Sequence, residues 1–202
     1  MEEIPLIPRK VFFGNPEKAS PQISPDGKYL AYLAPDEGVL NVWVAPVEDI
    51  SRAHPVTRDR KRGIRFYSWA YTNRHILYLQ DKEGDENWRV YSVDIFSEEV
   101  KDLTPIENVQ ARIQEISPKY PEEILIALND RNPQFHDIYR IHIITGEKKK
   151  VLENPGFFSF ITDDDYRVRF AMQFTPDGGS EILIPSQKGG WESFLKIDYE
   201  DS

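Results

Sequence analysis

The sequence predicts an all-β protein made of β-propeller blades, and three observations lead to this prediction. The aromatic residues Trp43, Tyr91 and Tyr139 lie 48 residues apart, each inside a phrase that alternates apolar and mostly polar positions as a half-buried strand does. Fifteen prolines and 11 glycines fit a turn-rich β protein, and no segment shows sustained 3.6-residue periodicity. Several short strands inside a repeat of this length are typical of a propeller blade.

The repeats cover nearly the whole chain of 202 residues. Residues 1–20 contain Pro5, Pro8 and Pro16 and are expected to form an extended lead-in. The remaining residues, 21–202, are expected to form the propeller segment, in repeats at approximately 21–60, 61–108, 109–155 and 156–202.

The first repeat contains the clearest turn of the chain. The residues Ser24-Pro25-Asp26-Gly27-Lys28 predict a tight turn, because Pro presets φ, Asp bonds the local backbone and Gly adopts the left-handed conformation. Strands are expected on both sides of this turn and further on, at 21–23, 29–33, around Trp43 and near 55–57.

The other repeats follow the same order of strands. In the second repeat strands are expected at 66–69, 75–79, 88–95 and 100–103. In the third they are expected at 112–116, 124–128, 137–143 and 149–152, and in the fourth at 157–161, 167–173, 181–184 and 193–197. Because propellers close with about 4–8 blades, four repeats make either a complete small ring or an arc of a larger one.

The composition argues against several classes of function. The net charge of −9 repels phosphate backbones and anionic lipids, so neither nucleic acid nor membrane is an expected partner. The absence of cysteine fits a reducing compartment, and no signal-peptide pattern or apolar run of about 20 residues occurs, so a cytoplasmic protein is expected. The four histidines are scattered without metal-ligand spacing, so neither metal nor other cofactor is expected.

The start of the chain resembles a known family of enzymes. The segments 12–17 and 20–32 are similar to the beginning of bacterial prolyl-oligopeptidase-family (S9) serine peptidases of the acylaminoacyl-peptidase and dipeptidyl-peptidase branch. Further similar stretches are 61–67, 76–81, 84–88 and 128–133. The resemblance implies an N-terminal propeller, with WD40-like repeats, that caps a C-terminal α/β-hydrolase domain and usually has seven or eight blades. Four blades would then be an incomplete arc.

The hydrolase half of such an enzyme is not found in these residues. A nucleophile elbow requires Gly-x-Ser-x-Gly, and the sequence lacks that pentapeptide. The resemblance therefore implies a non-catalytic segment, inactive alone, that gates and selects peptide substrates for an absent C-terminal α/β-hydrolase domain of the same polypeptide. The alternative function is a free-standing four-bladed propeller that binds proteins or peptides.

Equivalent loops of two repeats supply the candidate substrate contacts. These are Asp85, Glu86 and Asn87 in the second repeat and Asp130, Arg131 and Asn132 in the third. Equivalent loops emerge on one face of a propeller, where charged side chains can hold the charged ends of a peptide. Alternatively, these residues cap tight turns through bonds to the local backbone. No catalytic residue is expected.

Two further features each leave alternatives open. The basic run Arg58, Arg60, Lys61, Arg62 and Arg65 is either a solvated connection between blades or a docking patch. An arc of blades also leaves two end faces uncovered, which predicts self-association through exposed blade faces or marginal stability.

Overall fold

The described strands form four antiparallel sheets of four strands each, in a computed structural model that describes residues 7–9 and 17–201. Most of the expected lead-in therefore lies outside the described residues. The first sheet consists of β1 (Ala19–Ile23), β2 (Tyr29–Asp36), β3 (Val39–Pro46) and β4 (His54–Pro55). The second consists of β5 (Phe66–Trp69), β6 (His75–Gln80), β7 (Arg89–Asp94) and β8 (Val100–Asp102). The third consists of β9 (Ala111–Ile116), β10 (Glu123–Asn132), β11 (Phe135–His142) and β12 (Lys148–Leu152). The fourth consists of β13 (Ser159–Thr162), β14 (Val168–Phe174), β15 (Ser180–Pro185) and β16 (Trp191–Ile197).

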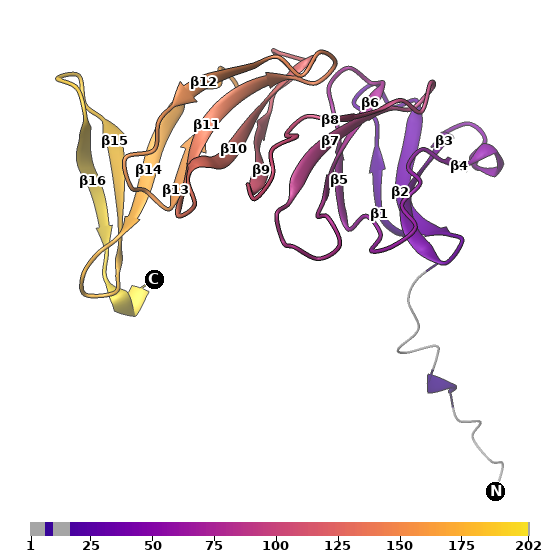
Figure 1. Cartoon of the computed structure of the whole chain (residues 1–202), viewed down its shortest axis with the longest axis horizontal. Helices are drawn as coiled ribbons and strands as arrows, with labels where there is room; N and C mark the ends of the chain where they lie inside the picture. Colours follow the sequence, from indigo (N-terminus) through magenta and orange to yellow (C-terminus); the bar gives the residue numbers. More distant parts are fainter. Residues whose placement is uncertain (1–6, 10–16, 202) are drawn as a thin grey trace, which may run out of the picture.

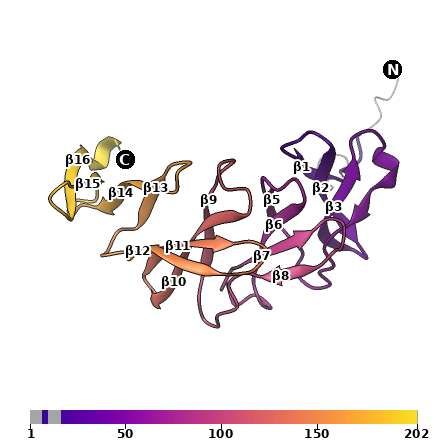
Figure 2. The ribbon, with the colours of Figure 1, turned by 90° about the horizontal axis from the view of Figure 1, so that it is seen from above.

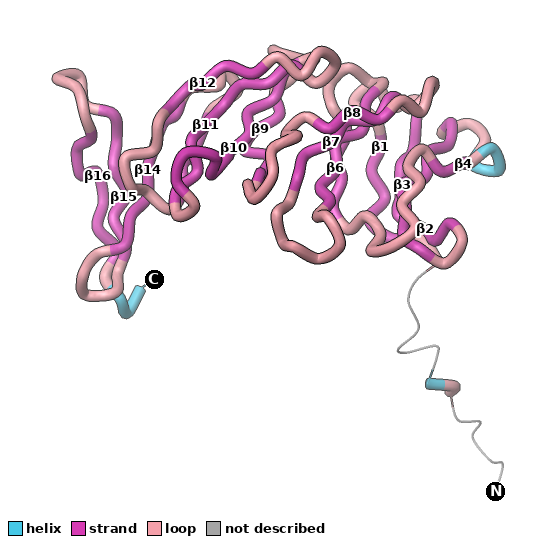
Figure 3. Tube along the Cα trace, in the orientation of Figure 1, coloured by secondary structure: helices cyan, strands magenta, loops and turns pink. Residues whose placement is uncertain are grey.

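The sheets follow one another along an open arc, in the order in which they occur in the sequence (Figures 1 and 2). The first and fourth sheets lie at opposite ends of this arc. Strands and loops dominate the described chain, and the helical elements η1 (Ile50–Arg52) and η2 (Tyr199–Asp201) are short 3₁₀ turns (Figure 3). The prediction of an all-β protein built as an arc of propeller blades is confirmed.

The predicted turn after β1 is closed by its own side chains. Ser24 Oγ donates to Asp26 Oδ1 at 2.7 Å and accepts from the amide of Tyr29 at 3.0 Å. Gly27 has a φ of +76°, a region that L-residues rarely adopt. The amide of Asp26 also donates to Asn73 Oδ1 at 2.8 Å, which joins this turn to the corresponding turn of the second sheet.

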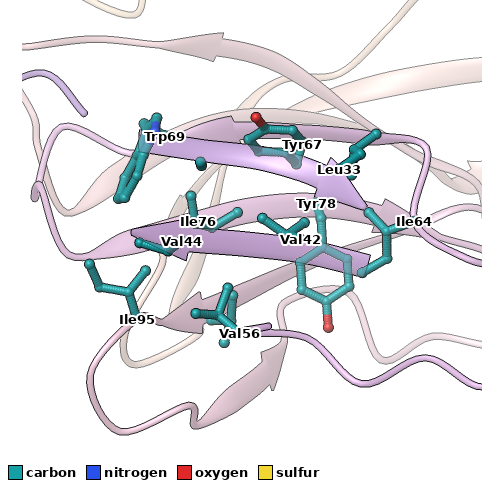
Figure 4. Close-up of a cluster of buried hydrophobic side chains, with 12 residues drawn as sticks. Leu33, Val42, Val44, Val56, Ile64, Tyr67, Trp69, Ile76, Tyr78 and Ile95 are labelled. Atoms are coloured by element: carbon teal, nitrogen blue, oxygen red, sulfur yellow. The ribbon is translucent and has the colours of Figure 1, made fainter. Parts of the chain in front are cut away.

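Three hydrophobic clusters hold the arc together, and each cluster lies between two neighbouring sheets. The first cluster packs Leu33, Val42 and Val44 of the first sheet against residues such as Trp69 and Ile76 of the second (Figure 4). The second and third clusters join the second sheet to the third and the third to the fourth in the same way. Because each sheet buries apolar side chains only against its neighbours, the stability of such an array is nearly one-dimensional.

Hydrogen bonds also cross between sheets. The indole of Trp69 donates to the carbonyl of Gln22 at 3.2 Å, and the side chain of Gln22 donates to the carbonyl of Tyr67 at 3.0 Å. Ser92, which is buried, donates to the carbonyl of Ile143 at 2.7 Å. These bonds fix the position of each sheet relative to the next.

The repeated aromatic residues occupy the same place in their sheets. Trp43 and Tyr91 lie opposite Tyr32 and Tyr78 on the preceding strand, and Tyr139 is likewise paired with a residue of β10. Tyr91 stacks on Tyr78 with ring centroids 5.2 Å apart. The recurrence of an aromatic residue every 48 positions is therefore explained by packing within and between sheets.

Candidate functional site

The loops that join the second and third strands of neighbouring sheets are connected along one edge of the arc. The connection between β4 and β5 carries the basic run, and three of its cations, Arg60, Lys61 and Arg62, pair with these loops. Arg60 contacts the β2–β3 turn, with Nη1 2.9 Å from Asp36 Oδ2 and Nε 3.2 Å from Glu37 Oε2. The next residue, Lys61, forms an ion pair with Glu83 in the β6–β7 loop. Arg60, Lys61 and Arg62 therefore tie two acidic loops together, whereas Arg58 pairs with Glu98 in the β7–β8 turn. A docking role of the basic run stays a prediction.

Arg62 makes the most enclosed of these contacts. Its Nε lies 3.3 Å from Oδ1 of Asp81, whose side chain is only 2% exposed. Gly84 has a φ of +91°, and a Cβ at this position would lie 2.4 Å from Arg62 Nη1. The guanidinium thus lies directly over the backbone of the β6–β7 loop. Beside it is a cavity of about 220 Å³, lined by Asp59, Lys61, Arg62, Gln80, Asp81, Lys82, Glu83, Arg89 and Tyr91.

Gln110 connects the two predicted contact loops. This residue lies in the connection between β8 and β9. Its side-chain amide donates to the carbonyl of Glu86 at 3.4 Å, and its backbone amide donates to Asn129 Oδ1 at 2.6 Å. The structure therefore brings the β6–β7 loop close to the end of β10, as expected for equivalent loops on one face. We call the β2–β3 turn, the β6–β7 loop and the end of β10, with the connections 56–65 and 103–110, the loop rim.

The predicted contacts in the β6–β7 loop are mostly engaged within the loop. Asp85 accepts hydrogen bonds from the amides of Lys82 and Asn87, at 3.2 and 3.0 Å, and from the side chain of Asn87 at 3.3 Å. Desolvation acts to raise the pKa of Asp85, but these bonds outweigh it and hold the pKa below its ordinary value. Glu86 has a φ of +58° and is exposed, and its carboxylate makes no hydrogen bond or ion pair with the described residues.

The predicted contacts on β10 also bond to neighbouring residues. Asp130 accepts a hydrogen bond from the hydroxyl of Tyr139 at 2.9 Å and lies 3.6 Å from Lys148 Nζ. Asn132 Oδ1 accepts from the amide of Gln134 at 2.9 Å, which closes the turn to β11.

Arg131 belongs to a network centred on a buried carboxylate. It donates from Nε and Nη2 to the two oxygens of Asp137, at 3.1 and 3.0 Å, and from Nη2 to the carbonyl of Asn154 at 2.7 Å. Asp137, which is fully buried, also accepts from Lys150 Nζ at 3.0 Å and from the amide of Asn154 at 2.9 Å. Desolvation acts to raise the pKa of Asp137, but the bonds from Arg131, Asn154 and Lys150 lower it to about 2.

These contacts match the turn-capping interpretation for Asp85 and Asn132, whereas the side chain of Asn87 donates to the carboxylate of Asp85. Substrate contact by the six candidates stays a prediction. Among them, the carboxylate of Glu86 is the most available to bind a substrate. Sequence reasoning did not select Asp81 or Gln110, because their roles depend on partners in other loops. Arg62 was noted in the sequence only as a member of the basic run and of the similar stretch 61–67.

Neither a cluster of metal ligands nor a membrane-spanning helix is found in the part of the chain that the structure describes. No group of three or more His, Cys, Asp or Glu side chains there is arranged to hold a metal ion. None of the described helices is long and apolar enough to cross a bilayer.

Two relatives match the chain over almost its whole length, although no protein-family model matches it. The chain is 45% identical over 197 residues to dipeptidyl aminopeptidase BIII of Pseudoxanthomonas mexicana, covering 97% of the chain. It is 33% identical over 213 residues to dipeptidyl peptidase family member 6 of Caenorhabditis elegans, covering 98% of the chain. The chain spans only 29% of the length of each relative.

The fold is also found in a solved propeller. The chain superposes on the β-propeller domain of the trilobed protease from Pyrococcus furiosus with a TM-score of 0.58 and 21% identity. This match covers 89% of the chain and 57% of the solved domain, and it concerns the fold alone.

The arc of blades with its loop rim defines a β-propeller segment. The relatives identify which one: the chain belongs to the propeller region of prolyl-oligopeptidase-family proteins of the dipeptidyl-peptidase-like branch. The resemblance noted in the sequence is confirmed.

Proposed function

We propose that this chain is the N-terminal propeller segment of a dipeptidyl-peptidase-type serine peptidase, and that it gates and selects peptide substrates. The catalytic Ser, Asp and His belong, in this proposal, to a C-terminal α/β-hydrolase domain of the same polypeptide. The similarity to two dipeptidyl-peptidase relatives, each more than three times as long as the match, supports this assignment. The cytoplasm is the proposed location, since a sequence without cysteine suits a reducing compartment.

The observation that carries the gating proposal is the loop rim. Arg60, Lys61 and Arg62 tie the β2–β3 turn to the β6–β7 loop, and Gln110 ties that loop to the end of β10. A continuous, internally bonded rim suits a steric filter, because its loops are held at fixed positions without a substrate. In the proposed mechanism this rim faces the hydrolase domain and admits only short or unfolded peptides.

The proposal that catalysis belongs to the hydrolase domain and not to the propeller segment is tested by comparing the isolated chain with the longer polypeptide. A dipeptidyl p-nitroanilide should be hydrolysed by the longer polypeptide and not by the 202-residue chain. A serine-directed fluorophosphonate should likewise label only the longer polypeptide. Hydrolysis that coincides with the monomer peak of the isolated chain would contradict the proposal, and so would a gene whose product ends at Ser202.

Selection by the rim is tested at Glu86 in the longer polypeptide. Glu86→Gln removes the one candidate carboxylate that is not engaged in the described structure, so KM for peptides with a free amino terminus should rise about three- to tenfold. KM for a small uncharged ester, which needs no such contact, should be unchanged. Glu99→Gln is the matched control, because Glu99 is exposed in the β7–β8 turn at the opposite end of β7 from the β6–β7 loop. Equal effects of the two substitutions would contradict a role of Glu86.

A further inference from the structure

The cavity beside Arg62 is lined by two residues that each have a buried polar atom without a partner. Oδ2 of Asp81 and Nε of Arg89 are buried, and neither has a hydrogen-bond partner among the described residues. Both residues line the cavity of about 220 Å³. Because about 90% or more of buried polar groups in folded proteins are hydrogen-bonded, a donor and an acceptor left over at one cavity indicate a partner from outside the chain.

The two residues are neighbours at the rim end of the second sheet. Asp81 directly follows β6, and Arg89, the first residue of β7, is paired with Gln80 across the two strands. The second sheet has a neighbouring sheet on each side, so the cavity is enclosed by parts of the chain that the structure describes. One ligand in this cavity can therefore reach both residues.

Both side chains are held in place by their other polar atoms. Oδ1 of Asp81 lies 3.3 Å from Nε of Arg62, and the side chain of Asp81 is only 2% exposed. Arg89 donates from Nη1 to Oδ2 of Asp102 at 3.1 Å. These ion pairs fix the two side chains and offset their charges. One carboxylate oxygen and one guanidinium N–H thus remain for a ligand.

This combination of one acceptor and one donor favours a neutral ligand. A carboxylate would be repelled by the free oxygen of Asp81, and an ammonium group would be repelled by the guanidinium of Arg89. A carboxamide carries an NH₂ donor and a carbonyl acceptor side by side. It can donate to Asp81 and accept from Arg89, and both hydrogen bonds are charge-assisted and therefore strong.

The volume of the cavity limits the size of the ligand. At about 30 Å³ for each water, the cavity corresponds to about seven water molecules, which is more than a single bridging water needs. It is also smaller than the about 300–1,000 Å³ of sites that enclose a whole small-molecule ligand. The space suits one side chain of a peptide.

We propose that this cavity binds the primary carboxamide of an Asn or Gln side chain of a peptide, with its NH₂ on Asp81 and its carbonyl on Arg89. The inference rests on the proposed function for the peptide as the source of the carboxamide. The cavity belongs to the loop rim, beside the β6–β7 loop that carries Glu86. A peptide with Gln at the bound position is therefore preferred over the same peptide with Glu.

The binding test uses propionamide, which reproduces the end of a glutamine side chain. It is titrated into the ¹⁵N-labelled chain, and the Nε–H signal of Arg89 is followed by NMR. The signal should shift saturably, with a dissociation constant of millimolar order. No saturable shift up to about 100 mM, well above a millimolar dissociation constant, would overturn the proposal.

Three other probes test the chemical class of the ligand. Propionate carries a negative charge, N-methylacetamide represents a backbone amide, and 1-propanol offers a single hydroxyl. Each should bind at least fivefold more weakly than propionamide. Equal binding of any of the three would overturn the assignment to a primary carboxamide.

Two substitutions remove the two unpartnered atoms and keep the ion pairs. Arg89→Lys retains a cation for Asp102 but has no Nε, and Asp81→Asn retains one oxygen for Arg62 but loses the second acceptor. Each should weaken propionamide binding at least tenfold, followed at the backbone amide of residue 81. Circular dichroism establishes that each variant is folded, and the titration of the original chain does not depend on either of them.

Two matched controls change the same residue types without removing these atoms. Arg65→Lys alters an exposed arginine that does not line the cavity. Glu83→Gln alters a lining carboxylate that is 67% exposed and paired with Lys61. Both should leave propionamide binding within about twofold of the original chain, since each hydrogen bond to the ligand is intact. Weakening by the controls equal to that of the two variants would overturn the proposal.

A kinetic measurement separates this inference from the proposed function. The longer polypeptide is supplied with otherwise identical peptides that carry Gln or Glu at each position in turn. At one position kcat/KM should favour Gln at least fivefold, and this preference should disappear in Arg89→Lys. Hydrolysis without such a preference would overturn the carboxamide site and leave the proposed function standing. Propionamide binding without any peptide hydrolysis would support the site and contradict the proposed function.

Discussion

Replacing Asp137 by asparagine should destabilise the third sheet more than any surface charge change. The Asp137 carboxylate is fully buried and accepts hydrogen bonds from Arg131, Lys150 and the amide of Asn154. Removing one partner of a buried ion pair costs about 3–5 kcal/mol. An asparagine retains one acceptor, and Arg131 and Lys150 remain 37% exposed and can be hydrated. We therefore expect a loss of about 2–3 kcal/mol in the free energy of unfolding.

The assay is urea unfolding followed by tryptophan fluorescence and circular dichroism. The matched control is Glu153→Gln, because Glu153 contacts the same two cations, with Oε1 3.8 Å from Arg131 Nε and Oε2 3.4 Å from Lys150 Nζ. Since Glu153 is 63% exposed, its removal should cost less than about 0.5 kcal/mol. Equal losses for the two variants would refute the reasoning that burial of the carboxylate determines its contribution.

The difference in unfolding free energy between the original chain and Asp137→Asn should depend on pH with a defined sign. The pKa of Asp137 is about 2 in the folded chain, below the ordinary value of 3.8. A lowered folded pKa means that the carboxylate stabilises the fold above the unfolded pKa and loses this contribution as pH falls through the folded one. The difference in the free energy of unfolding between the original chain and Asp137→Asn should therefore be constant above about pH 5 and shrink between about pH 5 and 2. A gap that grows on acidification would contradict this assignment.

Two further substitutions test how the sheets and loops are joined. Ser92→Ala should cost about 1–2 kcal/mol in urea unfolding, because it leaves the buried carbonyl of Ile143 without its 2.7 Å hydrogen bond from the second sheet; a loss no larger than that of the exposed-turn control Ser97→Ala would contradict this. Gly84→Ala should cost more than Gly27→Ala, by up to about 1 kcal/mol, since both have positive φ but only Gly84 places a Cβ 2.4 Å from the Arg62 guanidinium. Equal costs would show that Arg62 does not lie over the loop in solution.

The fold was predictable because the repeats share the same order of short strands. Strand alternation and turn residues specify hairpins, and the predicted strands at Phe66–Trp69 and around Trp43 and Tyr91 are found in the structure. The prediction fell short at β10, which extends from Glu123 to Asn132 and not only over 124–128. Its polar end resembles a turn in the sequence, but a register shift after Leu128 allows Asn132 to pair with Phe135. Such a register shift depends on the partner strand, so the sequence of β10 alone does not reveal it.

The candidate site was less predictable, because its side chains find partners that sequence spacing does not reveal. The Asp85 cap is local and follows from the residue types alone. By contrast, Arg62 meets Asp81 across two loops, and Gln110 connects Glu86 to Asn129 only because two sheets lie side by side. The sequence predicted that the two loops lie on one face, but it did not indicate which of their polar residues already have partners within the chain.

The ion pairs inside the loop rim favour steric filtering over electrostatic selection as the main effect in the gating proposal. Arg60, Lys61 and Arg62 form ion pairs with four of the rim's carboxylates, and Arg131 is paired with Asp137. Charges that are paired at short range produce a weak field at the distance of an approaching peptide. Steric filtering by fixed loops is therefore the main effect expected of this segment. In the gating proposal, electrostatic selection is assigned chiefly to Glu86, so a rim variant that breaks an ion pair should change the size of the admitted peptides more than the preference for their charge.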